Sequence, residues 1–360
     1  MSDYSRKIVL LGWAASTHLQ KWARGLRGRG WQVKVLTPDN YALTDIETIK
    51  IPGGKRYYWR GSSFVSKALR EFKPDLFHVH YVGGFGWLGM RSGFRPVIMS
   101  AWGADVIDLP KNPLLRYIIS RILQSADHVT TTSPLLKEAC LRLAPHIGSH
   151  LTVIPFGVEI PEQTTTYPQG SFRICYIKKH EYKYGPELLL DAVLRLLDDG
   201  LDIELTMAGE GKLTGQLRQK VERAGQSDRI RFPGFVDHSQ IYDLLGCHNL
   251  MVMPSVQESE SFGVAAVEAS ACSRPVIASR IGGVPDVIQE GKTGLLVPPG
   301  DSLALAEAIR KLYLERDLSE KLGMEGRKYV AAHYSWDVSL NQMIEVYEKT
   351  IRQYQKNTPV

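Results

Sequence analysis

The first half of the chain alternates short apolar runs with segments whose apolar residues recur at helical spacing. Apolar runs typical of buried strands occupy residues 7–12, 31–37, 76–81, 97–101, 128–132 and 152–154. Between them, the spacing of apolar residues predicts helices over 17–29, 63–72, 113–124 and 134–143. Strands that alternate with helices are typical of a doubly wound parallel sheet, so we expect an α/β fold.

The same alternation restarts after a segment of different composition. Residues 161–170, Pro-Glu-Gln-Thr-Thr-Thr-Tyr-Pro-Gln-Gly, resemble a linker and predict a domain boundary. Further strands are expected at 172–177, 203–208, 230–235, 250–255 and 274–278, with helices at 187–197, 213–223, after 263 and after 301, the last over 336–354. The sequence therefore predicts two Rossmann-like domains, residues 1–160 and 171–334.

Composition fits a globular protein without a membrane span. Hydrophobic residues make up 44% of the chain and charged residues 23%. No apolar run approaches the ~18 residues that a spanning helix needs. The four cysteines, at positions 140, 175, 247 and 272, show no C-x-x-C spacing, which favours reduced core residues over a zinc site or disulfides. We therefore expect a cytoplasmic protein.

Charge is distributed unevenly between the two halves. Residues 1–155 carry 21 Lys and Arg against 10 Asp and Glu, a net of +11, and the remainder carries 23 against 28, a net of −5. Such asymmetry points to an anionic partner of the first half, and the inner face of a cell membrane, an anionic lipid-linked acceptor or nucleic acid would all fit. A solvated basic surface without a partner explains the charge equally well.

Two carboxylates flank the start of a predicted helix in the stretch Glu260-Ser-Phe-Gly-Val-Ala-Ala-Val-Glu268. An apolar run precedes the stretch, so a strand, a loop and a helix N-terminus meet here, and the free N–H groups of that terminus attract an anion. Carboxylates would repel a bare phosphate but accept hydrogen bonds from hydroxyls. A nucleotide-sugar has both phosphates for the helix N-terminus and hydroxyls for the carboxylates. Taken alone, the pair also fits ordinary capping and a solvated surface glutamate.

The residues that follow extend this pattern. Arg274-Pro-Val-Ile-Ala278 predicts a strand, Ile281-Gly-Gly-Val-Pro-Asp286 a tight turn, and Gly291 to Gly300 a closing segment. The run 254–300 resembles the donor-binding segment of the retaining glycosyltransferases of family four, which have the GT-B fold. The resemblance extends over the whole chain and is most specific after residue 170. It implies two Rossmann-like domains facing across a cleft, with the last helix crossing back to the first domain.

This resemblance implies roles for residues that bind the donor. Glu268 accepts hydrogen bonds from the ribose hydroxyls, and Glu260 lies beside the hydroxyls of the transferred sugar. The backbone N–H groups of Phe262, Gly263 and Val264 hold sugar and phosphate.

Two glycine-containing turns in the second half resemble further family elements. Gly209-Glu-Gly211 follows a predicted strand and resembles a family turn, although on its own it is more often a plain turn. The segment Gly234-Phe235-Val236 is expected to border the nucleobase.

Cationic side chains are expected to meet the diphosphate. The leaving nucleoside diphosphate needs a divalent metal or a set of preorganised donors, and the sequence lacks a clustered Asp-x-Asp for a metal. Lys183 falls on the family's phosphate-binding lysine, and Lys178 falls where the family usually has arginine. Lysine keeps the positive charge of arginine but lacks the planar guanidinium group that can donate two hydrogen bonds to a phosphate at once. Without the resemblance, both would be solvated surface lysines.

The resemblance assigns the acceptor to the first domain. Gly12 ends the first strand, where open α/β sheets bind ligands, and it matches part of a family Gly-Gly pair. Ser100-Ala-Trp102-Gly-Ala-Asp105 resembles a His-Gly-x-Asp element, with Trp102 in place of the histidine. Any contact that the histidine ring makes in the family is therefore lost in this chain or made by His80 instead. Asp105 either orients an acceptor hydroxyl or caps the following turn.

These expectations combine into one functional hypothesis. The resemblance implies a retaining, metal-independent glycosyltransferase that moves a sugar from a UDP- or GDP-linked donor to a glycan or lipid-linked acceptor, without a further cofactor and without binding nucleic acid. Cell-envelope glycan synthesis would fit the basic first half. The alternatives are a nucleotide-sugar epimerase and a silent binding module. A dinucleotide-dependent dehydrogenase is disfavoured, because the loop after the first strand lacks G-x-G-x-x-G.

Overall fold

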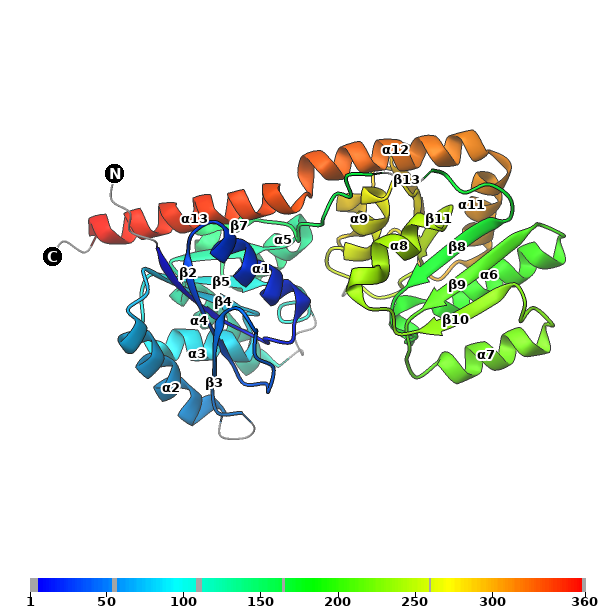
Figure 1. The fold of residues 1–360 in the computed structure, drawn as a ribbon. Coiled ribbons are helices and arrows are strands. Elements are labelled where there is room, and N and C mark those ends of the chain that lie inside the picture. The colour runs from blue at the N-terminus through cyan, green and yellow to red at the C-terminus, as the bar shows by residue number, and fades with distance from the viewer. Residues whose placement is uncertain (1–5, 54–56, 108–111, 164–165, 259, 358–360) are drawn as a thin grey trace. The chain divides into compact units, whose positions relative to one another are not determined.

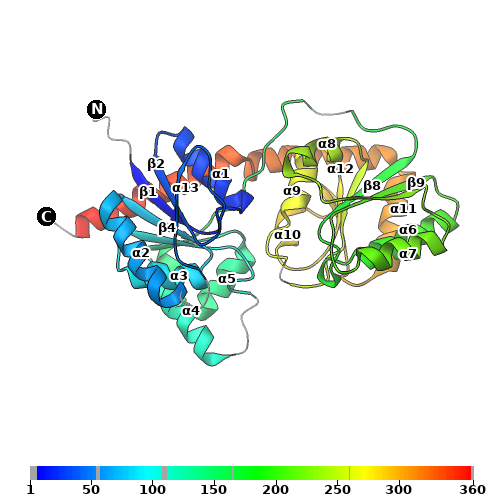
Figure 2. The ribbon, with the colours of Figure 1, turned by 60° about the horizontal axis from the view of Figure 1, so that its bottom comes forward.

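The computed structural model describes residues 6–53, 57–107, 112–163, 166–258 and 260–357. The chain divides into two compact units. Unit 1 comprises residues 1–156 and 339–360, and unit 2 comprises residues 157–338. Each unit has its own parallel sheet with helices on both faces (Figure 1; Figure 2). The predicted α/β class with two Rossmann-like sheets is confirmed.

Unit 1 has a sheet of strand order β3-β2-β1-β4-β5-β6-β7, and all the pairings described in it are parallel. Its strands are β1 Lys7–Leu11, β2 Gln32–Thr37, β3 Glu47–Lys50, β4 Leu76–His80, β5 Val97–Ala101, β6 His128–Thr131 and β7 Leu151–Val153. Its helices are α1 Thr17–Gly28, α2 Tyr57–Phe72, α3 Gly84–Ser92, α4 Pro113–Ser125 and α5 Pro134–Leu143, with the 3-10 helix Pro145–His150. The β1–β4 pairing reverses the strand order, which creates the switch point where ligands bind in such sheets.

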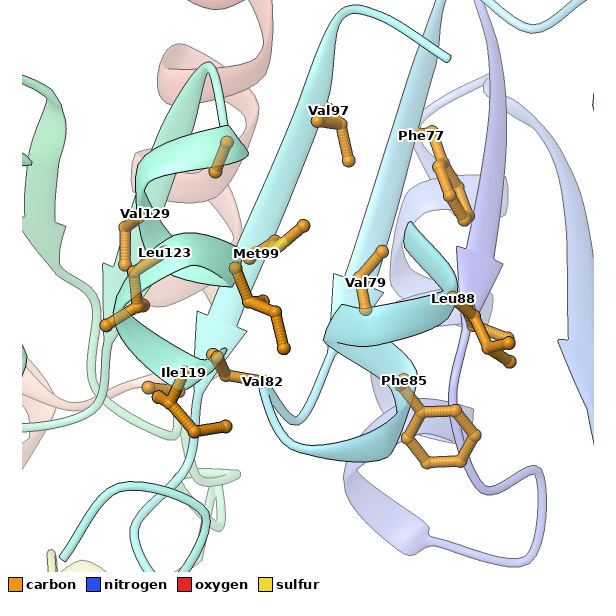
Figure 3. Packing of buried hydrophobic residues seen from close by; sticks show 14 of the residues in the cluster. Phe77, Val79, Val82, Phe85, Leu88, Val97, Met99, Ile119, Leu123 and Val129 are labelled. Carbon is orange, nitrogen blue, oxygen red and sulfur yellow. The ribbon is translucent and has the colours of Figure 1, made fainter. Parts of the chain in front are cut away.

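The main core of unit 1 lies between this sheet and helices α2 to α5. Figure 3 shows part of it, with residues of β4, β5 and β6 facing residues of α3 and α4: Phe77, Val79, Val97, Met99 and Val129 against Phe85, Leu88, Ile119 and Leu123. The opposite face carries α1 and the C-terminal helix α13 Trp336–Asn357. Tyr347 of α13 is fully buried, and its hydroxyl lies 2.6 Å from His78 Nδ1 in β4. The C-terminal helix thus returns to the first unit.

Unit 2 has a sheet of strand order β10-β9-β8-β11-β12-β13. Its strands are β8 Phe172–Ile177, β9 Ile203–Ala208, β10 Ile230–Gly234, β11 Leu250–Met253, β12 Val276–Ser279 and β13 Gly294–Val297. Its helices are α6 Pro186–Asp198, α7 Thr214–Arg223, α8 Ile241–Gly246, α9 Val264–Ala271, α10 Val284–Val287, α11 Ser302–Leu314 and α12 Arg316–His333, with 3-10 helices at Tyr182–Tyr184 and His238–Gln240. The central strands are apolar on both sides, as buried parallel strands require.

The predicted linker 161–170 belongs to unit 2 and, as far as its residues are described, packs against the rest of that unit. Arg327 donates to the carbonyl of Pro161, and Arg274 donates to the carbonyl of Thr166. The Tyr167 ring is buried, and its hydroxyl donates to Ser319 Oγ at 2.7 Å. The polar composition of residues 161–170 therefore reflects a segment that is held in place through its backbone carbonyls.

The prediction from the pattern needs correction in its elements and in one cysteine. Strands β3 and β13 and helices α3 and α8 were not predicted, and Cys247 is exposed rather than part of the core. Helix α3 has the sequence Gly-Phe-Gly-Trp-Leu-Gly-Met-Arg-Ser, whose glycines have poor helix propensity. They are needed because a Cβ at Gly86 or Gly89 would lie 2.6 Å from Ile122 or 2.7 Å from Val79. Close packing has overridden propensity here.

Candidate active site

Loops at the carboxyl edge of the unit 2 sheet bring Lys178 and Glu260 together. Lys178 follows β8 and Glu260 follows β11, strands that are neighbours in the sheet. The ammonium Nζ lies 2.8 Å from Glu260 Oε2, and the glutamate side chain is only 9% exposed. Ser255 Oγ donates to the same carboxylate oxygen at 3.4 Å. A positive and a negative group are thus held side by side at the edge where parallel sheets bind ligands.

Lys183 reaches the same region through the ring of Tyr184. The ammonium of Lys183 lies 4.8 Å from the centre of this ring, and the ammonium of Lys178 lies 4.9 Å from it. Cation–π contacts of this length hold both charges near one aromatic group. The carbonyl of Lys183 also accepts a hydrogen bond from Val256 N, which ties the loop to the end of β11. Both ammonium groups therefore lie within 5 Å of the centre of one aromatic ring.

The turn at Gly282 supports the loop that carries Glu260. Gly282 has φ of +58°, and a Cβ there would lie 2.1 Å from the carbonyl oxygen of Glu260. Gly283 N donates to that same oxygen at 2.9 Å. Only glycine combines this backbone conformation with so close an approach.

The predicted turn Gly209-Glu-Gly211 lies against the loop that follows β8. A Cβ at Gly209 would lie 2.1 Å from the carbonyl oxygen of Lys178, and one at Gly211 would lie 2.4 Å from that of His180. His180 is fully buried, and its Nδ1 lies 2.9 Å from Thr214 Oγ1. The turn thus fixes the backbone that carries Lys178.

Helix α9 begins with the residues expected to hold sugar and phosphate. Gly263 precedes the helix with φ of +83°, and among the described residues no side chain caps the first turn, which starts at Val264. Uncapped N–H groups at a helix start remain available to an anion. Phe262 is buried and packs edge-to-face on Tyr334 at 5.6 Å. Its side chain anchors the loop while its backbone lies at the helix start.

Glu268 has a partner that the sequence did not reveal. Its carboxylate Oε1 lies 2.8 Å from His238 Nε2, and the glutamate is only 6% exposed. A buried carboxylate needs hydrogen-bond donors, and the imidazole supplies one. His238 lies 30 residues away, so no local pattern could indicate the pair. Just before it, Phe235 is 79% exposed and Val236 is half-buried. An exposed aromatic ring beside a predicted base site is available for stacking.

In unit 1, Asp105 joins the ends of two strands. Its carboxylate accepts hydrogen bonds from Val82 N at 2.7 Å, Gly103 N at 2.8 Å and Trp102 N at 3.1 Å. Burial raises the pKa of this carboxyl to about 6, although the backbone donors oppose that shift. These contacts favour the turn-capping alternative over a carboxylate that is free to orient a hydroxyl.

His80 and Gly12 lie next to each other in unit 1. A Cβ at Gly12 would lie 3.3 Å from His80 Cβ. The His80 ring centre lies 5.1 Å from that of Trp102, and burial lowers the His80 pKa to about 3, with His18 contributing. This imidazole is therefore neutral at physiological pH.

Neither a metal cluster nor a membrane span is found in the described parts of the chain. No group of three or more His, Cys, Asp or Glu side chains is gathered as metal ligands among those residues. The helices described there also include none that is long and apolar enough to cross a bilayer.

Comparisons with known proteins identify the family and the fold. The family model described as "Glycosyl transferases group 1" matches residues 160–329, and "Glycosyl transferase 4-like" matches residues 7–133. The D-inositol 3-phosphate glycosyltransferase of Streptomyces bingchenggensis is 32% identical over 316 residues, which cover 78% of this chain and 68% of that protein.

Solved structures show the same fold. Sucrose-phosphate synthase from Thermosynechococcus elongatus superposes with a TM-score of 0.82 at 24% identity, covering 97% of this chain and all of that one. HepE from Anabaena, solved in complex with UDP and glucose, superposes with a TM-score of 0.78 at 18% identity, covering 95% and 99%. The chain has the GT-B fold and belongs to the group 1 glycosyltransferases, of the family-four type.

Proposed function

We propose that this glycosyltransferase moves a sugar from a UDP- or GDP-linked donor to a glycan or lipid-linked acceptor, with retention at the anomeric carbon. The observation that carries the proposal is that Lys178 pairs with Glu260, four residues before the start of α9, and lies on the Tyr184 ring that Lys183 also contacts. This arrangement places positive charge and backbone N–H groups next to a carboxylate, as a diphosphate linked to a sugar requires.

Each group has a defined role in this proposal. The two lysines stabilise the charge that develops on the leaving diphosphate, so that a divalent metal is not needed for this step. Glu260 accepts hydrogen bonds from the hydroxyls of the sugar, and Glu268 accepts them from the ribose. The leaving phosphate removes the proton of the attacking acceptor hydroxyl on the same face of the sugar. The structure of HepE with UDP and glucose supports a nucleotide-sugar donor.

His238 and Phe235 complete the nucleotide site in this proposal. The imidazole holds one oxygen of Glu268, which leaves the other oxygen for the ribose hydroxyls. The exposed Phe235 ring offers a face to the base.

A membrane surface is the proposed location of the acceptor. On α1, the positive charges of Arg24 and Arg27 are partly neutralised, because both side chains pair with Asp45. Helix α4 instead exposes Leu114 and Tyr117, at 66% and 63%. Apolar side chains on a basic unit favour peripheral contact with anionic lipid. If the protein failed to bind phosphatidylglycerol vesicles at both low and high salt, this part of the proposal would be contradicted.

The proposal is tested with the full chain and defined donors. Thermal unfolding is measured with UDP-, GDP- and ADP-glucose, since a ligand that binds the folded state raises the midpoint. We expect one nucleotide to stabilise unit 2 and its sugar to appear on an added acceptor with the donor's anomeric configuration. Conversion of the donor without acceptor to an isomeric nucleotide-sugar would indicate an epimerase. Binding without any product would indicate a silent module.

A further inference from the structure

A cavity of about 470 Å³ lies at the amino edge of the unit 1 sheet. It is lined by the segments that lead into β4 and β5, together with residues from the last turns of α2 and α13. Strands β4 and β5 are neighbours in the sheet, so their starts lie side by side. Gly12, His80 and Trp102 lie at the carboxyl ends of strands. The cavity is therefore separate from the edge where parallel sheets usually bind their ligands.

Part of the cavity wall is apolar and continuous with the core of unit 1. Leu69 and Ile351 line it and are almost fully buried. Phe94 and Tyr354 also line it and are half-buried, so their rings supply accessible apolar surface. The Phe94 ring packs edge-to-face on Phe77, a core residue in Figure 3, with 6.3 Å between ring centres. The wall is thus held in place by the core behind it.

Two cationic side chains of this cavity have no partner in the described part of the chain. Arg70 and Lys73, at the end of α2, are exposed, and neither side chain makes an ion pair or hydrogen bond with a described residue. Glu71, the acidic residue between them in sequence, pairs with Lys67 instead, at 3.8 Å. Both positive charges are therefore available to a ligand.

The other charged residues that line the cavity are already paired. Asp75 accepts a hydrogen bond from Lys7 N at 2.8 Å, and its second carboxylate oxygen lies 3.6 Å from Arg6 Nη1. The guanidinium of Arg95 donates to Asp127, with Nε at 3.0 Å from Oδ1. Because these charges are balanced by their partners, the excess positive charge of the cavity belongs to Arg70 and Lys73. A ligand with negative charge is attracted there.

Lys73 occupies a backbone position that usually belongs to glycine. Its φ is +50°, and its N–H donates to the carbonyl of Leu69 at 2.9 Å, directly after the end of α2. Many helices end on a residue in this left-handed conformation, and glycine is preferred there because it has no Cβ. A lysine at this position strains the backbone, while its side chain lines the cavity. The strain also means that glycine can replace this lysine without disturbing the turn.

The chemistry of the cavity selects an anion with an apolar part. A phosphate monoester carries about −1.5 to −2 charge at pH 7, which suits two cations, and arginine can donate two parallel hydrogen bonds to it. A bare phosphate would leave the rings of Phe94 and Tyr354 without a contact. The cavity holds about 15 groups of the size of a water molecule, at roughly 30 Å³ each. A phosphate on an alkyl chain of about ten carbons has this size.

We propose that this cavity binds an amphiphilic phosphate monoester, with its phosphate at Arg70 and Lys73 and its apolar chain against Phe94 and Tyr354. The site goes beyond the proposed function, because none of its residues is assigned to the donor or the acceptor. Tyr354 belongs to α13, so a bound ligand joins the end of this helix to the end of α2. A soluble alkyl phosphate and a lipid with a phosphate monoester head group share this chemistry, and the test separates the two sources.

The test measures the binding of decyl phosphate to the full chain by titration calorimetry, below the concentration at which decyl phosphate forms micelles. Inorganic phosphate lacks the chain, decyl maltoside lacks the charge, and adenosine monophosphate has a base and a sugar in place of the chain. We expect saturable binding of decyl phosphate that is about 10-fold tighter, or more, than that of each rival. Equally tight binding of any rival would overturn the proposal.

Variants separate the loss of the site from damage to the fold. Lys73→Gly removes the cation and relieves the left-handed strain. It should weaken the binding of decyl phosphate about 10-fold, while the midpoint of thermal unfolding stays the same or rises. The double variant Arg70→Gln/Lys73→Gly should lose the binding. Lys67→Gln, an exposed position of α2 outside the cavity, is the matched control and should bind as the parent chain does. Equal binding by the parent chain and the double variant would overturn the proposal.

Vesicles distinguish a membrane source from a soluble one. Phosphatidylcholine vesicles with and without phosphatidic acid, whose head group is a phosphate monoester, are sedimented with the parent chain and with the double variant. Sedimentation that requires both phosphatidic acid and the two cations would assign the site to a lipid. Binding of decyl phosphate without such sedimentation would assign it to a soluble ligand. If neither interaction depends on Arg70 and Lys73, the proposal is wrong.

Discussion

The carboxyl edges of the two parallel sheets are formed in the same way but carry different chemical groups. In unit 2, the edge gathers Lys178, Lys183, Glu260 and Glu268 around glycine turns. In unit 1, the corresponding edge carries Trp13, His80 and Trp102, although residues 1–155 have a net charge of +11 and the remainder is net negative. The net charge of a unit therefore says little about its site, because the basic residues of unit 1 lie largely elsewhere.

The difference teaches how each edge can select a ligand. Charged groups at the unit 2 edge suit a ligand that carries its own charge, and they bind more weakly in high salt. Neutral aromatic groups at the unit 1 edge suit a ligand recognised by shape and hydroxyls.

The largest expected effect comes from Glu268→Ala. The variant removes a buried carboxylate that would accept hydrogen bonds from the ribose hydroxyls, each worth about 1.5–3 kcal/mol. We predict a loss of roughly 100-fold or more in the affinity for the nucleotide, measured by titration calorimetry. Glu222→Ala, on the exposed face of α7, is the matched control. Unchanged affinity in Glu268→Ala would contradict the proposed ribose site.

A smaller loss is expected from Lys178→Ala. Removing this ammonium takes a cation from the diphosphate and leaves Glu260 without its ion pair. We predict about 10- to 100-fold weaker binding of the nucleoside diphosphate, with little change for the free nucleoside, because only the former carries the charge. Lys179→Ala is the control, since this neighbouring lysine is exposed. Equal losses for diphosphate and nucleoside would show that Lys178 does not act on the phosphates.

Two glycine variants of unit 2 separate the effect of backbone strain from the effect of the close approach to Glu260. Gly282→Ala places a methyl group against the Glu260 carbonyl in a left-handed conformation, whereas Gly291→Ala meets the same backbone strain with no atom within 4 Å. We predict that both variants lose about 1 kcal/mol from strain, and that Gly282→Ala loses a further 1–3 kcal/mol of unfolding free energy and weakens nucleotide binding. Denaturant titration measures the first quantity. Equal stability of the two variants would mean that the close approach is unimportant.

The effect that is smallest near neutral pH concerns the unit 1 edge, and it develops only as the pH falls. The pKa of His80 is lowered from 6.5 to about 3 by burial, so the unfolded chain binds a proton that the folded chain does not. Stability from this group is complete above pH 6.5 and falls as the pH decreases toward 3, by up to about 1.4 kcal/mol per pH unit. His78, whose pKa is also lowered, acts in the same direction. Asp105 acts in the opposite direction, because its raised pKa lowers stability as the pH rises from 3.8 to about 6.

Hydrogen exchange in the buried strands of unit 1 measures this dependence. The variant His80→Phe should flatten it by about one proton, while His146→Asn, an exposed control, should leave it unchanged. An identical slope in the parent chain and in His80→Phe would mean that His80 is not held neutral by the fold.

The unit 2 edge was more predictable from sequence than the unit 1 edge for a physical reason. The residues expected to bind the sugar donor lie in short local stretches. Glu260, Gly263 and Glu268 could therefore be assigned to a segment of strand, loop and helix directly from the sequence. Their individual roles stay predictions. The partner of Glu268 could not be found, because His238 is 30 residues away and imidazole is common in cores.

The unit 1 edge depends on contacts between distant residues. His78 pairs with Tyr347, 269 positions later, and Asp105 reaches back to Val82 across two strand ends. Neither contact leaves a periodic signal. The sequence left Asp105 between two roles, and its three backbone donors favour the structural one. Trp13 was noted only as part of the loop after the first strand, since exposure cannot be deduced from residue type.

A crystal structure with the nucleotide that binds in the thermal screen tests the central claim most directly. The account predicts that the ribose hydroxyls lie within hydrogen-bond distance of Glu268 and that the diphosphate lies beside Lys178, Lys183 and the start of α9. A nucleotide bound elsewhere, with Glu268 still contacting only His238 and Lys178 still paired with Glu260 alone, would contradict it.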